Sequence, residues 1–244
     1  MVESFAWGLI AASSLVLGAL LAIYIKIGRR SIGLIMAFGT GVLVSAVAFD
    51  LVEEATTTAP GSGVVIAAGL FAGCLTFFVG DLAIDRLGGE DRKAMTGEQR
   101  EGSPLAIVLG TVLDGVPESM VIGLTLLGGG SIGISYLAAV FISNLPESIS
   151  STTGLVAGGW SRSRVLGMWG FVALISGVAA LAGFTLFDTA PPEAVAFVLA
   201  FAGGAILTML ADTMAPEAYE HAGPQTGIAT TLGFAVAYGL HVLA

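Results

Sequence analysis

Two short motifs place carboxylates beside a proline within otherwise apolar stretches of the chain. They are Asp114-Gly115-Val116-Pro117-Glu118-Ser119 and Ser143-Asn144-Leu145-Pro146-Glu147-Ser148. In a helix, Asp114 and Glu118 share a face because they are four residues apart. Glu147 shares a face with Ser143 and Asn144, which precede it by four and three residues. Carboxylate, amide and hydroxyl oxygens are ligands that hard divalent cations prefer, so the two motifs together predict an oxygen-rich cation site.

Both motifs lie near the centres of stretches that are long enough to cross a bilayer. An ionised carboxylate at that depth costs at least about 2.5–3.5 kcal/mol, so it needs a cation, a proton or water. Each proline also crowds the carbonyl four residues earlier, at Leu113 or Ile142, which can supply a further oxygen ligand. The alternative is that the prolines are ordinary kinks and the glutamates are protonated and hydrogen-bonded. The repetition of Pro-Glu-Ser in successive stretches favours the cation site.

The composition is that of a membrane protein. Of the 244 residues, 55 % are hydrophobic and 11 % are charged, whereas soluble domains carry about 25 % charged residues. Glycine is spread through the apolar stretches, which favours close helix packing. The single cysteine, Cys74, excludes a disulfide within the chain and multi-thiolate metal sites. The net charge of −9 offers no basic surface, so no nucleic-acid partner is expected.

Apolar runs between short polar breaks predict an all-α membrane protein with eight transmembrane helices in a single domain, 1–244. We expect these helices at 5–25, 31–52, 63–83, 104–128, 132–157, 164–187, 193–219 and 225–243. The longer charged segment 85–103 is expected to be a cytoplasmic loop. The first apolar run is too long for a cleaved signal peptide and lacks a preceding positive charge, so we expect it to remain as a helix.

The basic residues predict the orientation. All nine Lys and Arg residues fall in the breaks after the first, third and fifth predicted helices: Lys26, Arg29, Arg30, Arg86, Arg92, Lys93, Arg100, Arg162 and Arg164. The positive-inside rule makes that side cytoplasmic and places both termini outside, which suits a plasma (inner) membrane. Trp7, Trp160 and Trp169 lie near predicted helix ends and are expected to anchor at the lipid interface.

A second repetition relates the second and seventh predicted helices. An Ala-Phe-x-x-Gly run begins at Ala37 and again at Ala200, and each phenylalanine is followed at the same distance by a glutamate, Glu54 or Glu217. The two helices are an odd number of spans apart, so the copies run in opposite directions. Inverted repeats of this kind are common in secondary transporters, whose sites lie near the membrane midplane.

Taken together, these motifs resemble the ZIP (Zrt-, Irt-like) family of divalent-metal transporters. The segment around Glu118 is similar to the His-Asn-x-Pro-Glu-Gly signature of that family, and the segment around Glu147 to its second Pro-Glu element. The resemblance implies that helices 1–3 are related to helices 6–8, with helices 4 and 5 central. It implies a carrier rather than an enzyme, with no resident cofactor, that moves a divalent cation into the cytoplasm. Zinc is the default ion, and the expected partners are that ion, the bilayer and, as an open alternative, a second copy in a homodimer.

The resemblance also assigns metal ligands. Glu118 and Glu147 match the two metal-binding glutamates, Asp114 takes the place of the signature histidine, and Asn144 takes that of a second-site ligand, with Ser143 as a further candidate. Because this set lacks imidazole and thiolate, ligand softness does not favour zinc, and manganese, iron(II) and magnesium stay open.

Two positions depart from the family pattern. Gly115 stands where the family has asparagine, and Ser176 stands where the sixth helix has a glutamate. We therefore predict a single-ion site rather than a binuclear one. A diverged protein of this fold that binds another cation or has a regulatory role remains an alternative. An intramembrane hydrolase is disfavoured, because no arginine follows Glu53-Glu54 and the two histidines are far apart.

Polar residues near the ends of the second and seventh predicted helices suggest a route. Asp50, Glu53 and Glu54 lie at the outer end of one, and Asp212, Glu217, Glu220 and His221 at the inner end of the other. A metal could pass these groups, although ordinary helix-end charges give the same pattern. His221 is a candidate for the inner exit, whereas His241 is expected at the interface on the opposite face.

Overall fold

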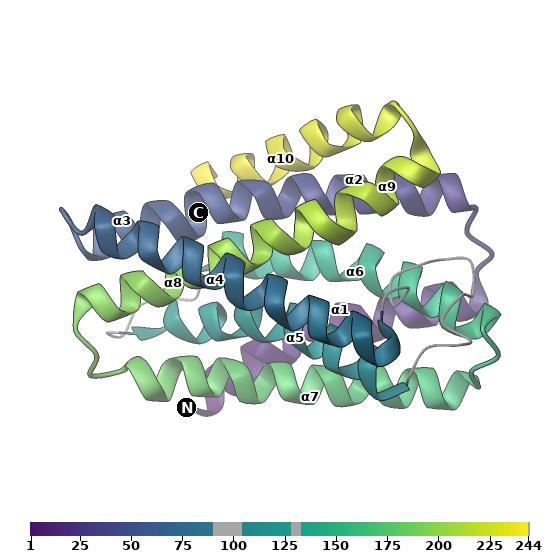
Figure 1. Cartoon of the computed structure of the whole chain (residues 1–244), viewed down its shortest axis with the longest axis horizontal. Helices are drawn as coiled ribbons and strands as arrows, with labels where there is room; N and C mark the ends of the chain where they lie inside the picture. The colour runs from purple at the N-terminus through teal and green to yellow at the C-terminus, as the bar shows by residue number, and fades with distance from the viewer. Residues whose placement is uncertain (90–103, 128–132, 244) are drawn as a thin grey trace.

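The computed structural model describes residues 1–89, 104–127 and 133–243, and these are almost entirely helical, as Figure 1 shows. The first helices are α1 (Val2–Tyr24), the continuous α2 (Arg29–Ser45), η1 (Ala46–Glu53) and α3 (Glu54–Thr58), and then α4 (Gly63–Ile84) with η2 (Asp85–Gly89). The others are α5 (Pro104–Leu124), α6 (Ile134–Ala157), α7 (Arg162–Phe187), the continuous α8 (Pro192–Met209), η5 (Leu210–Met214) and α9 (Ala215–Ala222), and α10 (Gln225–Leu243). The all-α class is confirmed.

Within the described residues, seven helical segments are long and apolar enough to cross a membrane. They are the segments that begin at Val2, Arg29, Gly63, Ala106, Arg162, Pro192 and Gln225. By length and composition the chain is therefore a multi-pass integral membrane protein. Each expected span coincides with a long helix, while 90–103 of the expected loop and the expected helix ends at 128 and 132 lie outside the described residues.

The second helix is longer than expected. It continues past 52 to Thr58, with its last part in η1 and α3. Within this polar end, the hydroxyls of Thr56 and Thr57 donate to the carbonyls of Val52 and Glu54 of the same helix. Apolar run length marks only the part of a helix that faces hydrocarbon, so it underestimates a helix that extends beyond the bilayer.

The seventh helix also continues, from the expected 219 to Ala222, and stops at Gly223, which has a positive φ of 63°. It passes Pro216 without breaking, because the wider π-helical turn η5 immediately precedes that proline. In an α-helix a proline clashes with the carbonyl four residues earlier. In a π-helical turn the hydrogen bonds instead join residues five apart, which widens the turn at this carbonyl.

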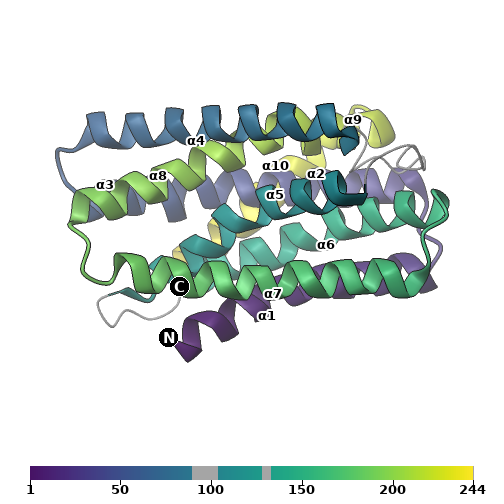
Figure 2. The same cartoon turned by 60° about the horizontal axis from the view of Figure 1, so that its bottom comes forward.

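The helices form two groups. In one, α1 packs along α6 and α7, and α5 packs along α7. In the other, α2 packs along α9 and α10, and α4 packs along α8; Figures 1 and 2 show α4 lying across α8. The groups meet where α2 contacts α6 and where α5 contacts α8. Helices α5 and α6, which carry the two motifs, therefore lie in the same group and face the other group from two sides.

Glycines allow the closest of these pairings. A Cβ on Gly204 of α8 would overlap the backbone carbonyl of Leu70 on α4, and one on Gly73 would overlap that of Phe201. The pair α2 and α10 makes the same reciprocal contact, through Gly41 against Thr230 and Gly233 against Phe38. Lipid tails are as apolar as leucine, so such backbone approach and the dispersion it brings are what hold membrane helices together.

Helix α6 is too polar to be counted with the seven apolar segments, yet more than half of its residues are buried. Its polar residues face the interior of the bundle, from Ser143 to Thr152. Trp169 of α7 is also fully buried, and its indole N–H donates to the Thr152 hydroxyl at 2.8 Å. The expectation that Trp169 anchors at the lipid interface is wrong, because this hydrogen bond satisfies its polar atom inside the protein.

We expect Gly204→Ala to lower the thermal unfolding midpoint in detergent, because overpacking a closely packed contact costs about 1–3 kcal/mol. Gly170→Ala is the matched control: a Cβ there meets nothing within 4 Å on the exposed side of α7. Alanine is favoured over glycine in an exposed helix by about 0.5–1 kcal/mol, so the control should unfold at the same or a higher temperature. Equal midpoints for the two variants would contradict the close α4–α8 approach.

Candidate metal site

All the side chains that the motifs nominated are buried. Asp114 and Glu118 of α5 are 3 % and 2 % exposed, and Glu147 of α6 is 6 % exposed. Asn144 and Ser143 are buried beside Glu147 on the same helix. Three carboxylates thus lie inside a membrane-spanning bundle, where an ionised group must be compensated by a cation, a proton or hydrogen bonds.

Small residues on two neighbouring helices hold the α6 motif in place. A Cβ on Gly39 of α2 would lie 3.0 Å from Pro146 Cγ and 3.4 Å from the Cα of Ser143. On the other side, a Cβ on Gly18 of α1 would lie 2.7 Å from the carbonyl oxygen of Leu145. The motif is therefore enclosed between α1 and α2, and α6 remains α-helical through Pro146.

The two motifs are not drawn into one compact cluster. Helix α5 packs mainly on α7 and α6 mainly on α1 and α2, so α5 and α6 touch only over a short stretch. One link between them is the Tyr136 hydroxyl, which donates to the backbone carbonyl of Glu118 at 3.3 Å. Among residues 1–89, 104–127 and 133–243, no three His, Cys, Asp or Glu side chains are grouped closely enough to hold one metal ion. The ligand set of Asp114, Glu118, Asn144, Glu147 and Ser143 stays a prediction.

The two departures from the ZIP pattern lie against each other. Gly115 of α5 faces α7, and a Cβ on it would lie 3.8 Å from the Ser176 hydroxyl oxygen. Ser176 is 3 % exposed, so this contact is inside the bundle. Gly115 and Ser176, the two positions at which the sequence departs from the motifs that it resembles, are thus neighbours, and both are small residues.

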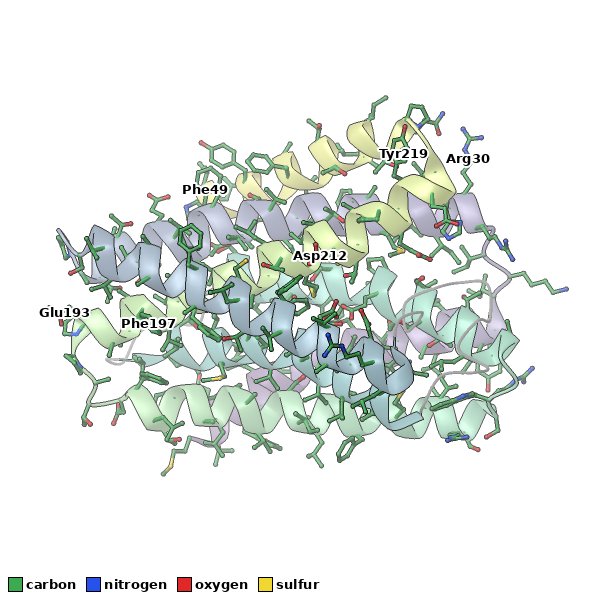
Figure 3. All side chains as sticks on the ribbon, in the orientation of Figure 1. Arg30, Phe49, Glu193, Phe197, Asp212 and Tyr219 are labelled. Atoms are coloured by element: carbon green, nitrogen blue, oxygen red, sulfur yellow. The ribbon has the colours of Figure 1, made fainter. Side chains whose placement is uncertain are left out.

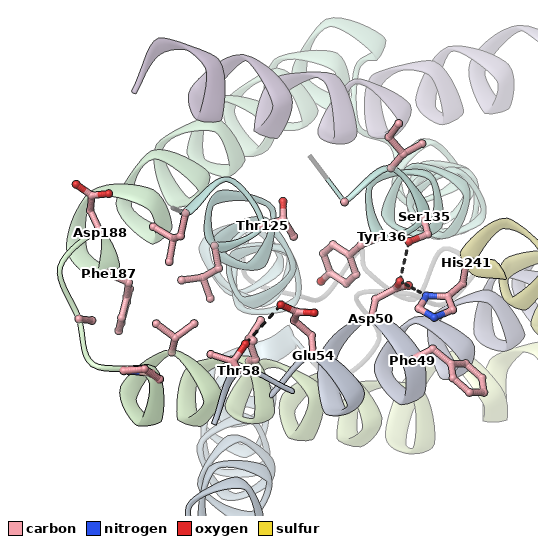
Figure 4. Close-up of a pocket in the computed structure, with 18 residues that line it drawn as sticks. Phe49, Asp50, Glu54, Thr58, Thr125, Ser135, Tyr136, Phe187, Asp188 and His241 are labelled. Atoms are coloured by element: carbon pink, nitrogen blue, oxygen red, sulfur yellow. Dashed lines mark hydrogen bonds and ion pairs between the residues drawn. The ribbon is translucent and has the colours of Figure 1, made fainter. Parts of the chain in front are cut away.

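A pocket of about 670 Å³ opens at the end of the bundle to which α3, α6 and α10 contribute (Figure 4). We call it the mouth pocket. Of the described residues that line it, Asp50, Glu54 and Asp188 are acidic, His241 is a histidine, and none is lysine or arginine. Tyr136 also lines the pocket, so the residue that bonds Glu118 lies between this opening and the α5 motif.

Asp50 joins three helical segments at the mouth pocket. Its Oδ1 accepts a hydrogen bond from the Ser135 hydroxyl at 2.7 Å and lies 2.8 Å from Nδ1 of His241 (Figure 4). The His241 ring packs against Phe49, with 5.6 Å between ring centroids. The expectation that His241 lies at the interface stays a prediction, and the structure adds its contacts with Asp50 and Phe49. Spacing could not reveal this cluster, because its members come from η1, the start of α6 and the end of α10.

The opposite end carries the basic residues. Figure 3 shows Arg30 at that end and Glu193 at the other. Arg162 lies over the ring of Tyr24, and Arg164 lies over Trp160 at 3.9 Å from its centroid. His221 pairs with Glu217 at 3.0 Å on the same helix, so the two histidines lie at opposite ends, as the sequence predicts. Arg92, Lys93 and Arg100 lie outside the described residues.

Comparison with models of known protein families gives no match, and comparison with curated proteins gives none either. The features that indicate a function are therefore the motifs, the buried carboxylates and the mouth pocket.

We expect Tyr136→Phe to lower the free energy of unfolding by about 1 kcal/mol, because it removes a buried hydrogen bond between α6 and α5. Tyr238→Phe is the matched control, since Tyr238 is 44 % exposed. Chemical denaturation in detergent measures both. A Tyr136→Phe variant as stable as the control would show that the contact with the Glu118 carbonyl contributes nothing.

Proposed function

We propose that this protein is a divalent-cation transporter that moves its ion between the mouth pocket and the basic end through the α5 and α6 motifs. The observation that carries the proposal is the burial of three carboxylates, Asp114, Glu118 and Glu147, inside a multi-pass bundle below an acidic opening. Intramembrane carboxylates are expensive, and in transporters they mark ion pathways. The structure supports this route by burial and position, and the ligand geometry is part of the proposal.

We further propose that the fold is an inverted repeat that exchanges α2 with α8 and α10 with α4. In support, Gly41 and Phe38 of α2 contact α10 through the same reciprocal pattern by which Gly204 and Phe201 of α8 contact α4. A π-helical stretch follows in each copy, as η1 after α2 and as η5 after α8. The pairs α1–α6 and α7–α5 correspond in the same way. Such a repeat gives two equivalent ways to arrange the helices around one site, as alternating access requires.

In this mechanism the cation loses water as it passes from the mouth pocket to the motif residues. Asp114 and Glu118 bind it from α5, while Glu147 and Asn144 bind it from α6. Because α5 and α6 touch only over a short stretch, the ion itself draws the two motifs together. Movement of the group α1, α5, α6 and α7 against the other group then opens the path to the basic end.

The charge distribution supplies the direction. We propose that the end with Lys26, Arg30 and Arg162 is cytoplasmic, by the positive-inside rule, and that the mouth pocket faces outward. An acidic pocket concentrates cations at the outer side. The transported ion would therefore enter the cytoplasm, as the ZIP resemblance implies.

We expect Glu118→Gln and Glu147→Gln each to reduce zinc uptake into sealed vesicles at least tenfold, because each removes one of the buried charges that would compensate the ion. Glu193→Gln, at the exposed start of α8, should transport like the native protein. Uptake that survives both motif substitutions would refute transport through this centre. Parallel assays with manganese, iron(II) and magnesium determine which ion is carried.

The contact between Gly115 and Ser176 allows a gain-of-function experiment. The double variant Gly115→Asn/Ser176→Glu places an amide and a carboxylate at neighbouring positions beside Asp114 and Glu118. We expect the number of zinc ions bound per chain, measured by equilibrium dialysis, to rise by one above that of the native protein. Gly115→Ala/Ser176→Ala, which adds no metal ligand, is the control and should bind the same number as the native protein. An unchanged stoichiometry in a folded double variant would argue against a metal centre beside Asp114 and Glu118.

A further inference from the structure

We propose that His241 is a capture ligand in the mouth pocket and that it favours nitrogen-binding divalent cations, such as zinc, over magnesium before the ion reaches the motif residues. This inference rests on the proposed transport function and concerns how that function selects its ion. The proposed ligand is the single imidazole nitrogen of His241, in a pocket of about 670 Å³ that carboxylates also line.

The contact with Asp50 determines which ring nitrogen of a neutral His241 carries the proton. Its Nδ1 lies 2.8 Å from Oδ1 of Asp50, and an ionised carboxylate can only accept a hydrogen bond. Nδ1 therefore carries the proton in the neutral ring, and the lone pair is on Nε2. Among the residues the structure describes, none forms a hydrogen bond with Nε2. A histidine whose Nδ1–H is bound by a carboxylate is the usual form of a metal-ligating histidine.

The imidazole ring of His241 is held in place by its neighbours. Asp50 is fixed by the Ser135 hydroxyl at 2.7 Å, and its side chain is 11 % exposed. The imidazole packs on Phe49 and is 30 % exposed, so it remains open to the pocket (Figure 4). Preorganisation lowers the cost of fixing a ligand when the ion arrives.

Acidic side chains line the same pocket as His241. Glu54 and Asp188 line the same pocket, and Glu54 accepts a weak hydrogen bond from Thr58 at 3.4 Å. Among the residues that the structure describes, no three His, Cys, Asp or Glu side chains are close enough together to hold one ion. An ion at His241 would therefore keep most of its water and be held loosely by one nitrogen ligand. Loose binding suits a capture site, because an ion in a pathway must also leave.

His241 would provide selectivity between cations, because its ligand atom differs from those of the motifs. The motif ligands Asp114, Glu118, Asn144 and Glu147 are all oxygen donors, which suit magnesium and manganese as well as zinc. Imidazole binds zinc, iron and copper far better than it binds magnesium. Of the two histidines in the chain, only His241 lines the mouth pocket. The nitrogen ligand that the motifs lack is therefore present where an incoming ion first meets the protein.

The test compares zinc and magnesium transport in sealed vesicles for His241→Gln and the control Glu193→Gln. Glu193 is exposed at the start of α8 and does not line the mouth pocket. We expect His241→Gln to raise the half-saturating zinc concentration about tenfold and to leave that for magnesium unchanged. The control should match the native protein for both ions. Unchanged zinc saturation in His241→Gln, or an equal loss for both ions, would overturn the inference.

A binding measurement separates this inference from the proposed function. In a Glu118→Gln/Glu147→Gln background, calorimetry with zinc should detect one weak site that disappears when His241→Gln is added. Asp50→Asn in the same background should weaken that site less, since an amide oxygen can still accept from Nδ1. Absence of any residual zinc binding in the background variant would overturn the capture site. Absence of transport by the native protein would instead refute the proposed function.

Discussion

A helix rich in polar side chains cannot face hydrocarbon without losing the hydration of those groups, and α6 is such a helix. Ser143, Asn144, Glu147 and Thr152 are all buried on it. The bundle must therefore surround α6 with protein, and it does so with α1 on one side and α2 on another. The more apolar α4 and α10 remain at the periphery, where their exposed side chains suit lipid. Hiding α6 decides which helices are central.

Enclosure alone would not bring helices into contact, because lipid solvates apolar helices equally well. The contacts between helices instead depend on glycine residues, which have no side chain to keep the backbones apart. Gly18 and Gly39 let α1 and α2 approach the Leu145–Pro146 region, and the glycine–carbonyl contacts of α2 with α10 and of α4 with α8 hold the outer helices. These glycines therefore have a structural role: they permit close approach of α2 to α10 and of α4 to α8 through the same kind of reciprocal contact.

Much of this arrangement was predictable from the sequence, and what was not has a physical reason. Run length and polar breaks predict the helices, because the bilayer imposes a minimum apolar length. Helix ends beyond the bilayer, as at Thr58 and Ala222, leave no such signal. The burial of Asp114, Glu118 and Glu147 was predictable, since each sits in the middle of a span. The separate packing of α5 and α6 was not, because it is determined by which neighbours offer glycines.

The mouth pocket lies across the boundary between the two helix groups. Its residues therefore belong to both of the groups that move in the proposed mechanism. Ser135 belongs to α6 in one group, whereas Asp50 and His241 belong to η1 and α10 in the other. In the proposed movement of one group against the other, the hydrogen bond between Ser135 and Asp50 is the contact of this cluster that crosses the boundary. The pair of Asp50 and His241 lies within one group, so the proposed movement does not separate these two residues.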